Sequence, residues 1–216
     1  MSHRVCVLVA LAVTLFDGVA AFSQKVSPPP TLSPEQRQAW EKVINDRMNI
    51  TMLKAKGGGL LAYFYCPSPC DDAGLALLAK IPDVTEISIN EADAITARGI
   101  ANFARMPRLR KLRLSELKKL NEEDLAELKR CEALEDLHLL HVCRLTDKGV
   151  KHLIGVPKLH RLDIHGASLT AESVEHFKRM RSLKQLKITY SGLTPEVIAR
   201  LRRLPGVEVE IGTVQR

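Results

Sequence analysis

Beyond residue 21 the sequence lacks any apolar stretch approaching the roughly 20 residues that a membrane-spanning helix needs. It also lacks three motifs that carry common enzyme chemistry: a glycine loop that cradles phosphate, a His-x-x-x-His pair, and a nucleophile with a recognisable oxyanion partner. We therefore predict no membrane span, no cofactor and no catalytic residue.

The first residues are typical of a signal peptide. Arg4 precedes an apolar run over 5–16, and small residues at 19–21 suit a signal peptidase. A mitochondrial presequence should be rich in Arg and Ser, so a single Arg argues against one. We predict a signal peptide over 1–21 and an exported protein, whether secreted, periplasmic or on the cell surface.

A linker and a cap follow. The prolines at 28–30 predict an extended linker over 22–32. Ser33 is a helix N-cap candidate, with Pro34 at the first helical position and Gln36 as its capping-box partner. They predict the start of a helical cap over 33–59, whose Trp40 we expect to cover the end of a core.

A pattern of Leu-x-x-Leu-x-Leu followed by Leu-Thr recurs five times. The units start at Val84, Leu109, Leu134, Leu159 and Leu183, in steps of 25, 25, 25 and 24 residues. The apolar positions predict one short strand per unit, and successive strands must pair in parallel. The Thr or Asn after each strand predicts a helix N-cap. The sequence therefore predicts an α/β solenoid over 60–212, ending in a strand near 207–211.

The run Leu145-Thr146-Asp147-Lys148-Gly149-Val150 resembles the leucine-rich repeat family, in the subtype whose units carry Leu-Thr-Asp-x-Gly-Leu/Val. This resemblance implies a right-handed solenoid like that of ribonuclease inhibitor, with strands on the concave face and short helices on the convex face. It also implies binding of other macromolecules. The Cys or Asn that many members carry after the strand is missing. That column holds Ala92, Leu117, Val142, Ala167 and Ser191.

An earlier, degenerate unit is found by subtracting 25 from the first clear one. Ala62 and Phe64 then occupy apolar columns, so Tyr63 and Tyr65 should point out of the sheet at its N-terminal end. Exposed aromatic pairs are a plausible binding feature. The alternative, which we weigh equally, is that they pack under the cap.

Outward strand positions carry charges that alternate from one repeat to the next. One column holds Lys111, Asp136 and Arg161, and another holds Arg113, His138, Asp163 and Lys187. Adjacent strands lie about 4.8 Å apart, so we favour a ladder of neutralised pairs over a dedicated ligand site. A nucleic-acid groove should present one sign of charge, so we predict no nucleic-acid partner.

The formal net charge of +7 must therefore collect elsewhere. Cations recur at the predicted last helical turns, at Lys80, Arg105, Lys129, Arg130, Lys178, Arg179, Arg202 and Arg203. Cations there complement the helix dipole, which is the interpretation we favour. Contact with an acidic polysaccharide or an anionic surface is the less supported alternative.

Four histidines come from two neighbouring predicted strands with Asp136 and Asp163 among them. They are His138, His141, His160 and His165. Such groups can bind zinc or act as a base. We favour an ordinary polar patch whose charge changes near pH 6, and we predict neither a metal nor an enzyme.

Cysteines give little support for export. Cys66 and Cys70 could close a small loop as a disulfide, although Cys70 also falls in a core column as a small buried residue. Cys131 and Cys143 lie too many repeats away to complete a zinc site with them.

Together these features predict an exported, monomeric, non-catalytic module that binds another protein or acts as a scaffold through its concave face. The alternative is an intracellular or mitochondrial adaptor or assembly factor with the same fold, and an enzyme or metal-binding protein is a third possibility. The candidate binding face comprises Tyr63, Tyr65, Lys111, Arg113, Asp136, His138, His141, Arg161, Asp163, His165 and Lys187.

Overall fold

The computed structural model describes residues 28, 32–45, 50–55, 58–64, 70–117, 119–142, 144–189 and 191–212. In chain order the elements are α2 (Pro34–Asn45), β1 (Ile50–Lys54), β2 (Leu60–Phe64), α3 (Asp72–Leu78), β3 (Val84–Asn90), α4 (Ala97–Asn102), the 3-10 helix η1 (Phe103–Arg105), β4 (Lys111–Ser115), the 3-10 helix η2 (Glu122–Arg130), β5 (Asp136–Leu140), α5 (Asp147–Leu153), β6 (Arg161–His165), α6 (Ala171–Arg179), β7 (Gln185–Thr189), α7 (Pro195–Leu201) and β8 (Glu208–Gly212).

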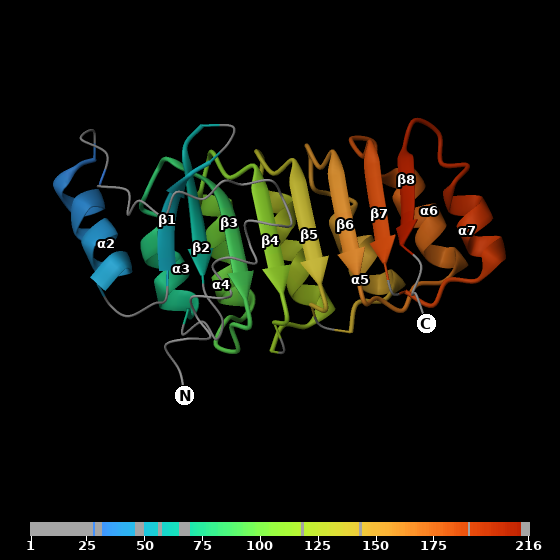
Figure 1. The fold of residues 1–216 in the computed structure, drawn as a ribbon, viewed down its shortest axis with the longest axis horizontal. Helices are drawn as coiled ribbons and strands as arrows, with labels where there is room; N and C mark the ends of the chain where they lie inside the picture. The colour runs from blue at the N-terminus through green and yellow to red at the C-terminus, as the bar shows by residue number, and fades with distance from the viewer. Residues whose placement is uncertain are drawn as a thin grey trace.

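The strands form one eight-stranded sheet in chain order, parallel from β2 to β8. Figure 1 shows this sheet as one layer, with α3 to α7 behind it and α2 at one end. The sheet is open, because its first and last strands do not pair. The predicted α/β leucine-rich-repeat fold is confirmed. No helix among the described residues is long and apolar enough to cross a membrane.

The repeat length sets the strand register. Leu112 pairs with Leu137, and Leu137 with Leu162, and all three side chains are fully buried. Because alternate strand residues face opposite sides, every apolar column points between the strands and the helices. Val150 and Leu153 of α5 meet this layer from the helix side. One continuous core therefore follows the length of the sheet.

The N-terminal end of this core is covered by α2 and by a strand that the sequence did not predict. Ser33 and Gln36 form the expected capping box at the start of α2, and Trp40 is buried. Next along the chain, β1 runs antiparallel to β2, pairing Ile50 with Phe64. The first edge of the parallel sheet is thus hydrogen-bonded and not exposed.

Where a repeat carries Asp or Glu at its helix start, the carboxylate links that repeat to the next. Glu122 Oε2 accepts hydrogen bonds from Thr146 N–H (3.0 Å), Thr146 Oγ1 (2.8 Å) and Gly149 N–H (3.1 Å). Asp147 accepts the equivalent bonds from Thr170 N–H (3.0 Å) and Thr170 Oγ1 (2.6 Å). The acid of the Leu-Thr-Asp run therefore holds the Thr one repeat further on, while each Thr caps its own helix.

Two departures from the repeat have local causes. Ala97 stands where the units on either side carry Asp72 and Glu122, and Asn121, one repeat on, donates its N–H to Asp124 in its own turn (2.9 Å). In α7 the sequence predicts a buried Ile198, but Val197 is buried and Ile198 is half-exposed. Thr194 caps the N–H of the third helical residue, whereas the other threonines cap the N–H of the second. The helix α7 therefore turns a different set of side chains toward the core.

Candidate binding face on the strands

The outward columns align across the sheet as the repeat predicts. One runs through Glu86, Lys111, Asp136, Arg161, Gln185 and Glu208, and the other through Tyr63, Ser88, Arg113, His138, Asp163, Lys187 and Glu210. From β4 onward both columns contain cations and anions on neighbouring strands, although Gln185 is uncharged and Arg113 is followed by His138. The face therefore carries fixed charges of both signs within short distances of one another.

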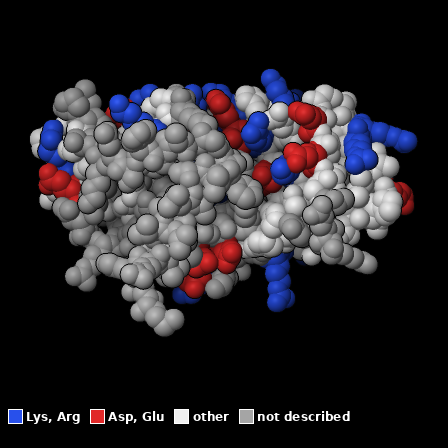
Figure 2. All heavy atoms as spheres, viewed as in Figure 1, with Lys and Arg blue, Asp and Glu red and all other residues white. Residues whose placement is uncertain are grey.

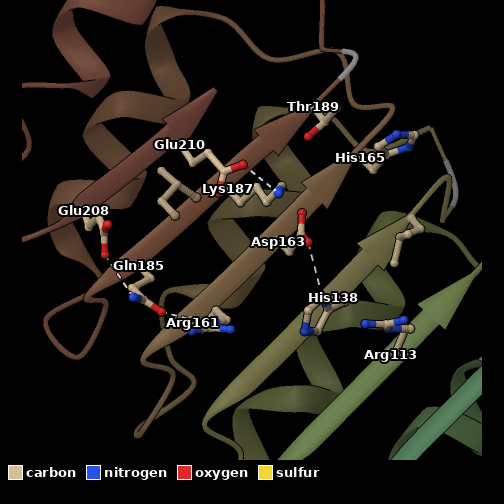
Figure 3. Close-up of a pocket in the computed structure, with 12 residues that line it drawn as sticks. Arg113, His138, Arg161, Asp163, His165, Gln185, Lys187, Thr189, Glu208 and Glu210 are labelled. Atoms are coloured by element: carbon tan, nitrogen blue, oxygen red, sulfur yellow. Dashed lines mark hydrogen bonds and ion pairs between the residues drawn. The ribbon is translucent and has the colours of Figure 1, made fainter. Parts of the chain in front are cut away.

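His138 lies between two carboxylates at the centre of this face. Its Nε2 lies 2.9 Å from Asp136 Oδ1, and its Nδ1 lies 3.3 Å from Asp163 Oδ2. The residue is only 7% exposed, contrary to the outward projection expected from the sequence. The contact with Asp136 is close, but its geometry is not that of a hydrogen bond. Asp136 Oδ1 and His138 Nε2 are both buried, and neither has a hydrogen-bond partner among the described residues. Both ring nitrogens are nonetheless turned to carboxylates of the protein itself. Figure 3 shows the contact with Asp163.

Neighbouring carboxylates shift the pKa of the His138 imidazole. Burial alone lowers the pKa of His138, but the contacts with Asp136 and Asp163 outweigh burial and leave the pKa above its ordinary value. Burial raises the pKa of Asp136, but His138, Lys111 and Arg161 together hold that pKa below its ordinary value. His138, Asp136 and Asp163 form a cluster of close contacts, and Lys111 Nζ lies 3.7 Å from Asp136 Oδ2 at its margin.

Two further polar connections extend toward the C-terminal strand. Arg161 Nε donates to Gln185 Oε1 (2.8 Å), and Gln185 Nε2 donates to Glu208 Oε2 (2.9 Å). Lys187 Nζ lies 2.7 Å from Glu210 Oε1. Figure 3 shows these side chains standing on β5 to β8 around the same space. Glu208, Glu210 and Gln185 were not among the predicted site residues, although the closing strand that carries the two glutamates was expected.

A pair of imidazoles lies where β5 and β6 end. His141 and His165 meet edge to face, with ring centroids 4.4 Å apart. His141 adopts a left-handed backbone (φ 51°), as do Glu91 and Glu116 at the equivalent positions. Burial and the neighbouring His141 lower the pKa of His165, although Asp163 opposes the shift. His160 precedes β6 at its other end, so the four histidines do not form one cluster.

The face is hollowed over its C-terminal half. A depression of about 750 Å³ is lined by Arg113, His138, Leu140, Arg161, Asp163, His165, Gln185, Leu186, Lys187, Thr189, Glu208 and Glu210. Six predicted residues contribute to it: Arg113, His138, Arg161, Asp163, His165 and Lys187. Lys111, Asp136 and His141 are not among its lining residues.

Other predicted residues lie apart from this hollow. Tyr63 is half-buried in β2, beside Thr51 of β1 and Ser88 of β3. Tyr65 and Cys66 fall outside the described residues, so the Tyr63–Tyr65 pair and the Cys66–Cys70 bridge stay predictions. Cys70 is buried in the core, and burial together with Asp71 and Asp72 raises its pKa to about 12.

Within the described part of the chain, no group of three or more His, Cys, Asp and Glu side chains is placed to hold a metal ion. His138 is also poorly placed as a base, because each ring nitrogen faces a carboxylate and not the open hollow. The arrangement can present charges in fixed positions. What it offers chemically is recognition of a ligand that carries both signs of charge.

No protein-family model matches the chain, and no curated protein matches it in sequence. Solved structures similar to it include a leucine-rich repeat protein of Leptospira interrogans, with TM-score 0.42, 20% identity, and coverage of 62% of this chain and 33% of that one. A chain of the yeast Rad7 and Elc1 complex has TM-score 0.45, 20% identity and coverage of 69% and 50%. Pollen Receptor Kinase 3 has TM-score 0.44, 15% identity and coverage of 82% and 94%.

The chain thus spans one third of the Leptospira chain and half of the yeast chain. Its own periodic sequence and open, mostly parallel sheet define an α/β leucine-rich-repeat-like fold.

Proposed function

We propose that this protein is a non-catalytic recognition module that binds a protein partner in the hollow over β4 to β8. The observation that carries the proposal is the arrangement of charges in that hollow. Arg113, Arg161 and Lys187 are interleaved with acids on neighbouring strands. A partner with only one sign of charge would meet repulsion from half of these groups. A protein surface, which carries both signs, can complement them.

The hollow is also organised before any partner binds. Asp163 is held by His138, and Gln185 is held between Arg161 and Glu208. Side chains already fixed by contacts with one another lose less conformational freedom on binding than mobile ones. The cluster around His138 therefore supports the face as a scaffold and leaves the more exposed Arg161 and Lys187 for contact with the partner.

The enzyme alternative has little support from this geometry. Thr189 is the hydroxyl-bearing residue that lines the hollow, and among the described residues no hydrogen bond joins it to a histidine or a carboxylate. A nucleophile should lie within hydrogen-bond reach of its base. A binding role needs no such pair.

Export is a separate part of the proposal and rests on Arg4 and the apolar run over 5–16, which lie outside the described residues. Expression in a secreting host followed by N-terminal sequencing tests it. Cleavage near residue 21 is the expected result. Retention of the uncleaved chain inside the cell would favour the adaptor or assembly-factor alternative.

The binding proposal is tested by affinity capture with paired variants. Arg161→Glu with Lys187→Glu reverses two charges in the hollow, while Lys148→Glu with Lys151→Glu reverses two exposed charges on α5. A partner that uses the hollow should be retained by the unchanged protein and by the α5 variant, and lost with the first variant. Equal retention by both variants, checked by direct titration of the purified partner, would overturn the proposal.

A further inference from the structure

Three neighbouring turns at one edge of the molecule carry six exposed cations and no acid. Each turn joins the end of a helix to the next strand, over residues 154–160, 179–184 and 202–207. The cations are Lys158, Arg179, Arg181, Lys184, Arg202 and Arg203. We call this set the C-terminal basic edge.

Hydrogen bonds place the three turns side by side. Ser182 Oγ donates to the Pro157 carbonyl (2.6 Å), and Lys184 N–H donates to the His160 carbonyl (2.8 Å). Glu208 N–H in turn donates to the Lys184 carbonyl (2.7 Å). Two strand spacings of about 4.8 Å therefore separate the outer turns where they meet the sheet. In Figure 2 much of the visible Lys and Arg lies along the upper part of the molecule, where the strands of Figure 1 begin.

The six cations lack ion pairs, because among the described residues no acid lies within ion-pair distance of any of them. Glu175 instead binds Lys178 and Arg200, and Glu208 accepts from Gln185. At the same edge of the N-terminal half, ion pairs join Lys80 to Glu35, Arg108 to Asp83 and Arg130 to Glu127. The positive charge of this edge is therefore concentrated at its C-terminal end.

Helix dipoles account for only part of this charge. Arg179, Arg202 and Arg203 lie at or just beyond the ends of α6 and α7, where a cation is favourable. Lys158, Arg181 and Lys184 lie beyond the last helical turn, where the dipole effect has fallen off. Mutual repulsion of six cations without acids is unfavourable for the protein alone, and an anionic ligand would remove it.

We propose that the C-terminal basic edge is a second binding site, for a linear acidic polysaccharide bearing sulfate or carboxylate groups. Four of the cations are arginines, whose planar forks bind such oxygen pairs bidentately. The three turns contain no Phe, Tyr or Trp on which nucleic-acid bases could stack, and the imidazole of His160 is half-buried. Apart from the exposed Pro157 and Pro205, their apolar side chains are buried or half-buried, which disfavours insertion into a lipid surface. This site is separate from the hollow and does not depend on the protein partner.

The experiment compares two variants of equal charge. The first replaces Arg179, Arg181, Arg202 and Arg203 by Gln, and the control replaces Lys80, Arg105, Arg108 and Arg130 by Gln. Affinities of the full chain for heparin, for sulfate-free alginate and for a DNA duplex are measured across a range of salt. Circular dichroism confirms the fold, and the smaller R181Q/R203Q variant gives the same comparison if the larger one unfolds.

We expect the unchanged protein to bind heparin or alginate more tightly than DNA, with affinity falling as salt rises. The first variant should lose about tenfold or more in affinity and show a flatter salt dependence, because fewer counterions are released. The control should stay within about threefold. Binding to heparin but not alginate would identify sulfate as the recognised group. Equal losses in both variants, tighter binding of DNA, or no binding of either polysaccharide would overturn the proposal.

Discussion

Replacing Glu122 by Ala should destabilise the protein much more than an ordinary change at its surface. The side chain belongs to η2, yet its carboxylate accepts two N–H groups and one hydroxyl from the start of α5, one repeat further on. The substitution therefore removes a connection between repeats. It also leaves the N–H groups of Thr146 and Gly149 without their acceptor.

The magnitude follows from those three contacts. A hydrogen bond to a charged group is worth about 1.5 to 3 kcal/mol. The three bonds share one carboxylate that is only partly buried, so they do not add fully, and we expect a loss of about 2 to 4 kcal/mol. The backbone of Gly149 already lies close to this side chain, because a Cβ added at Gly149 would lie 3.0 Å from the Glu122 Cβ. For a chain of this size a loss of about 3 kcal/mol lowers Tm by roughly 6 to 12 °C.

Urea unfolding and thermal melting followed by circular dichroism measure the effect. Glu123→Ala is the matched control, because Glu123 is the next residue of η2 and is exposed. Its loss should stay within about 0.5 kcal/mol. A double-mutant cycle with Thr146→Val should give a coupling of about 1 kcal/mol or more. Losses at Glu122 and Glu123 that agree within about 0.5 kcal/mol would refute the reasoning.

Three further predictions concern the binding face and the core. Because the folded pKa of His138 lies above the unfolded value of about 6.5, its stabilisation is complete below that pH and is lost as pH rises through the folded pKa. In an NMR titration His138 should titrate above His165, and the reverse order would contradict the cluster. Gly166→Ala should cost about 1 to 3 kcal/mol by urea unfolding, because φ is +77° and the Cβ would meet a neighbouring imidazole. Gly192→Ala has φ +62° in open space and should cost less, so equal losses would oppose this account. Burial raises the pKa of Cys131 to about 12, so mass spectrometry should find it unmodified by thiol reagents at pH 8 until the protein is unfolded; modification of the folded protein would contradict its burial.

The strand columns could be predicted from the sequence because they depend on two periods alone. A repeat of 25 residues places Lys111, Asp136 and Arg161 side by side, and alternation along a strand fixes the face to which they belong. The helix starts were equally accessible, since Thr146 and Thr170 cap their helices through local contacts. Neither inference needed knowledge of side-chain packing.

Three features of the candidate sites could not be obtained that way. The burial of His138 depends on how closely Asp136 and Asp163 approach its ring from two strands. The strand at Ile50–Lys54 carries no repeat signal, and its antiparallel pairing depends on the free edge of β2. The positions of the charges in the sequence also could not say which cations lack an acid, because Lys80, for example, pairs with the distant Glu35.

The sequence by itself determined that this protein is a solenoid of strand and helix, with alternating charges on its strands and cations near its helix ends. A one-dimensional repeat places equivalent residues beside one another, so periodicity alone carries that information. Only the tertiary structure decided that His138 is enclosed by two carboxylates, that a hollow opens over β4 to β8, and that the unpaired cations gather on the last three turns. These properties depend on distances between side chains of different repeats, which burial and rotamers set and which spacing along the chain does not.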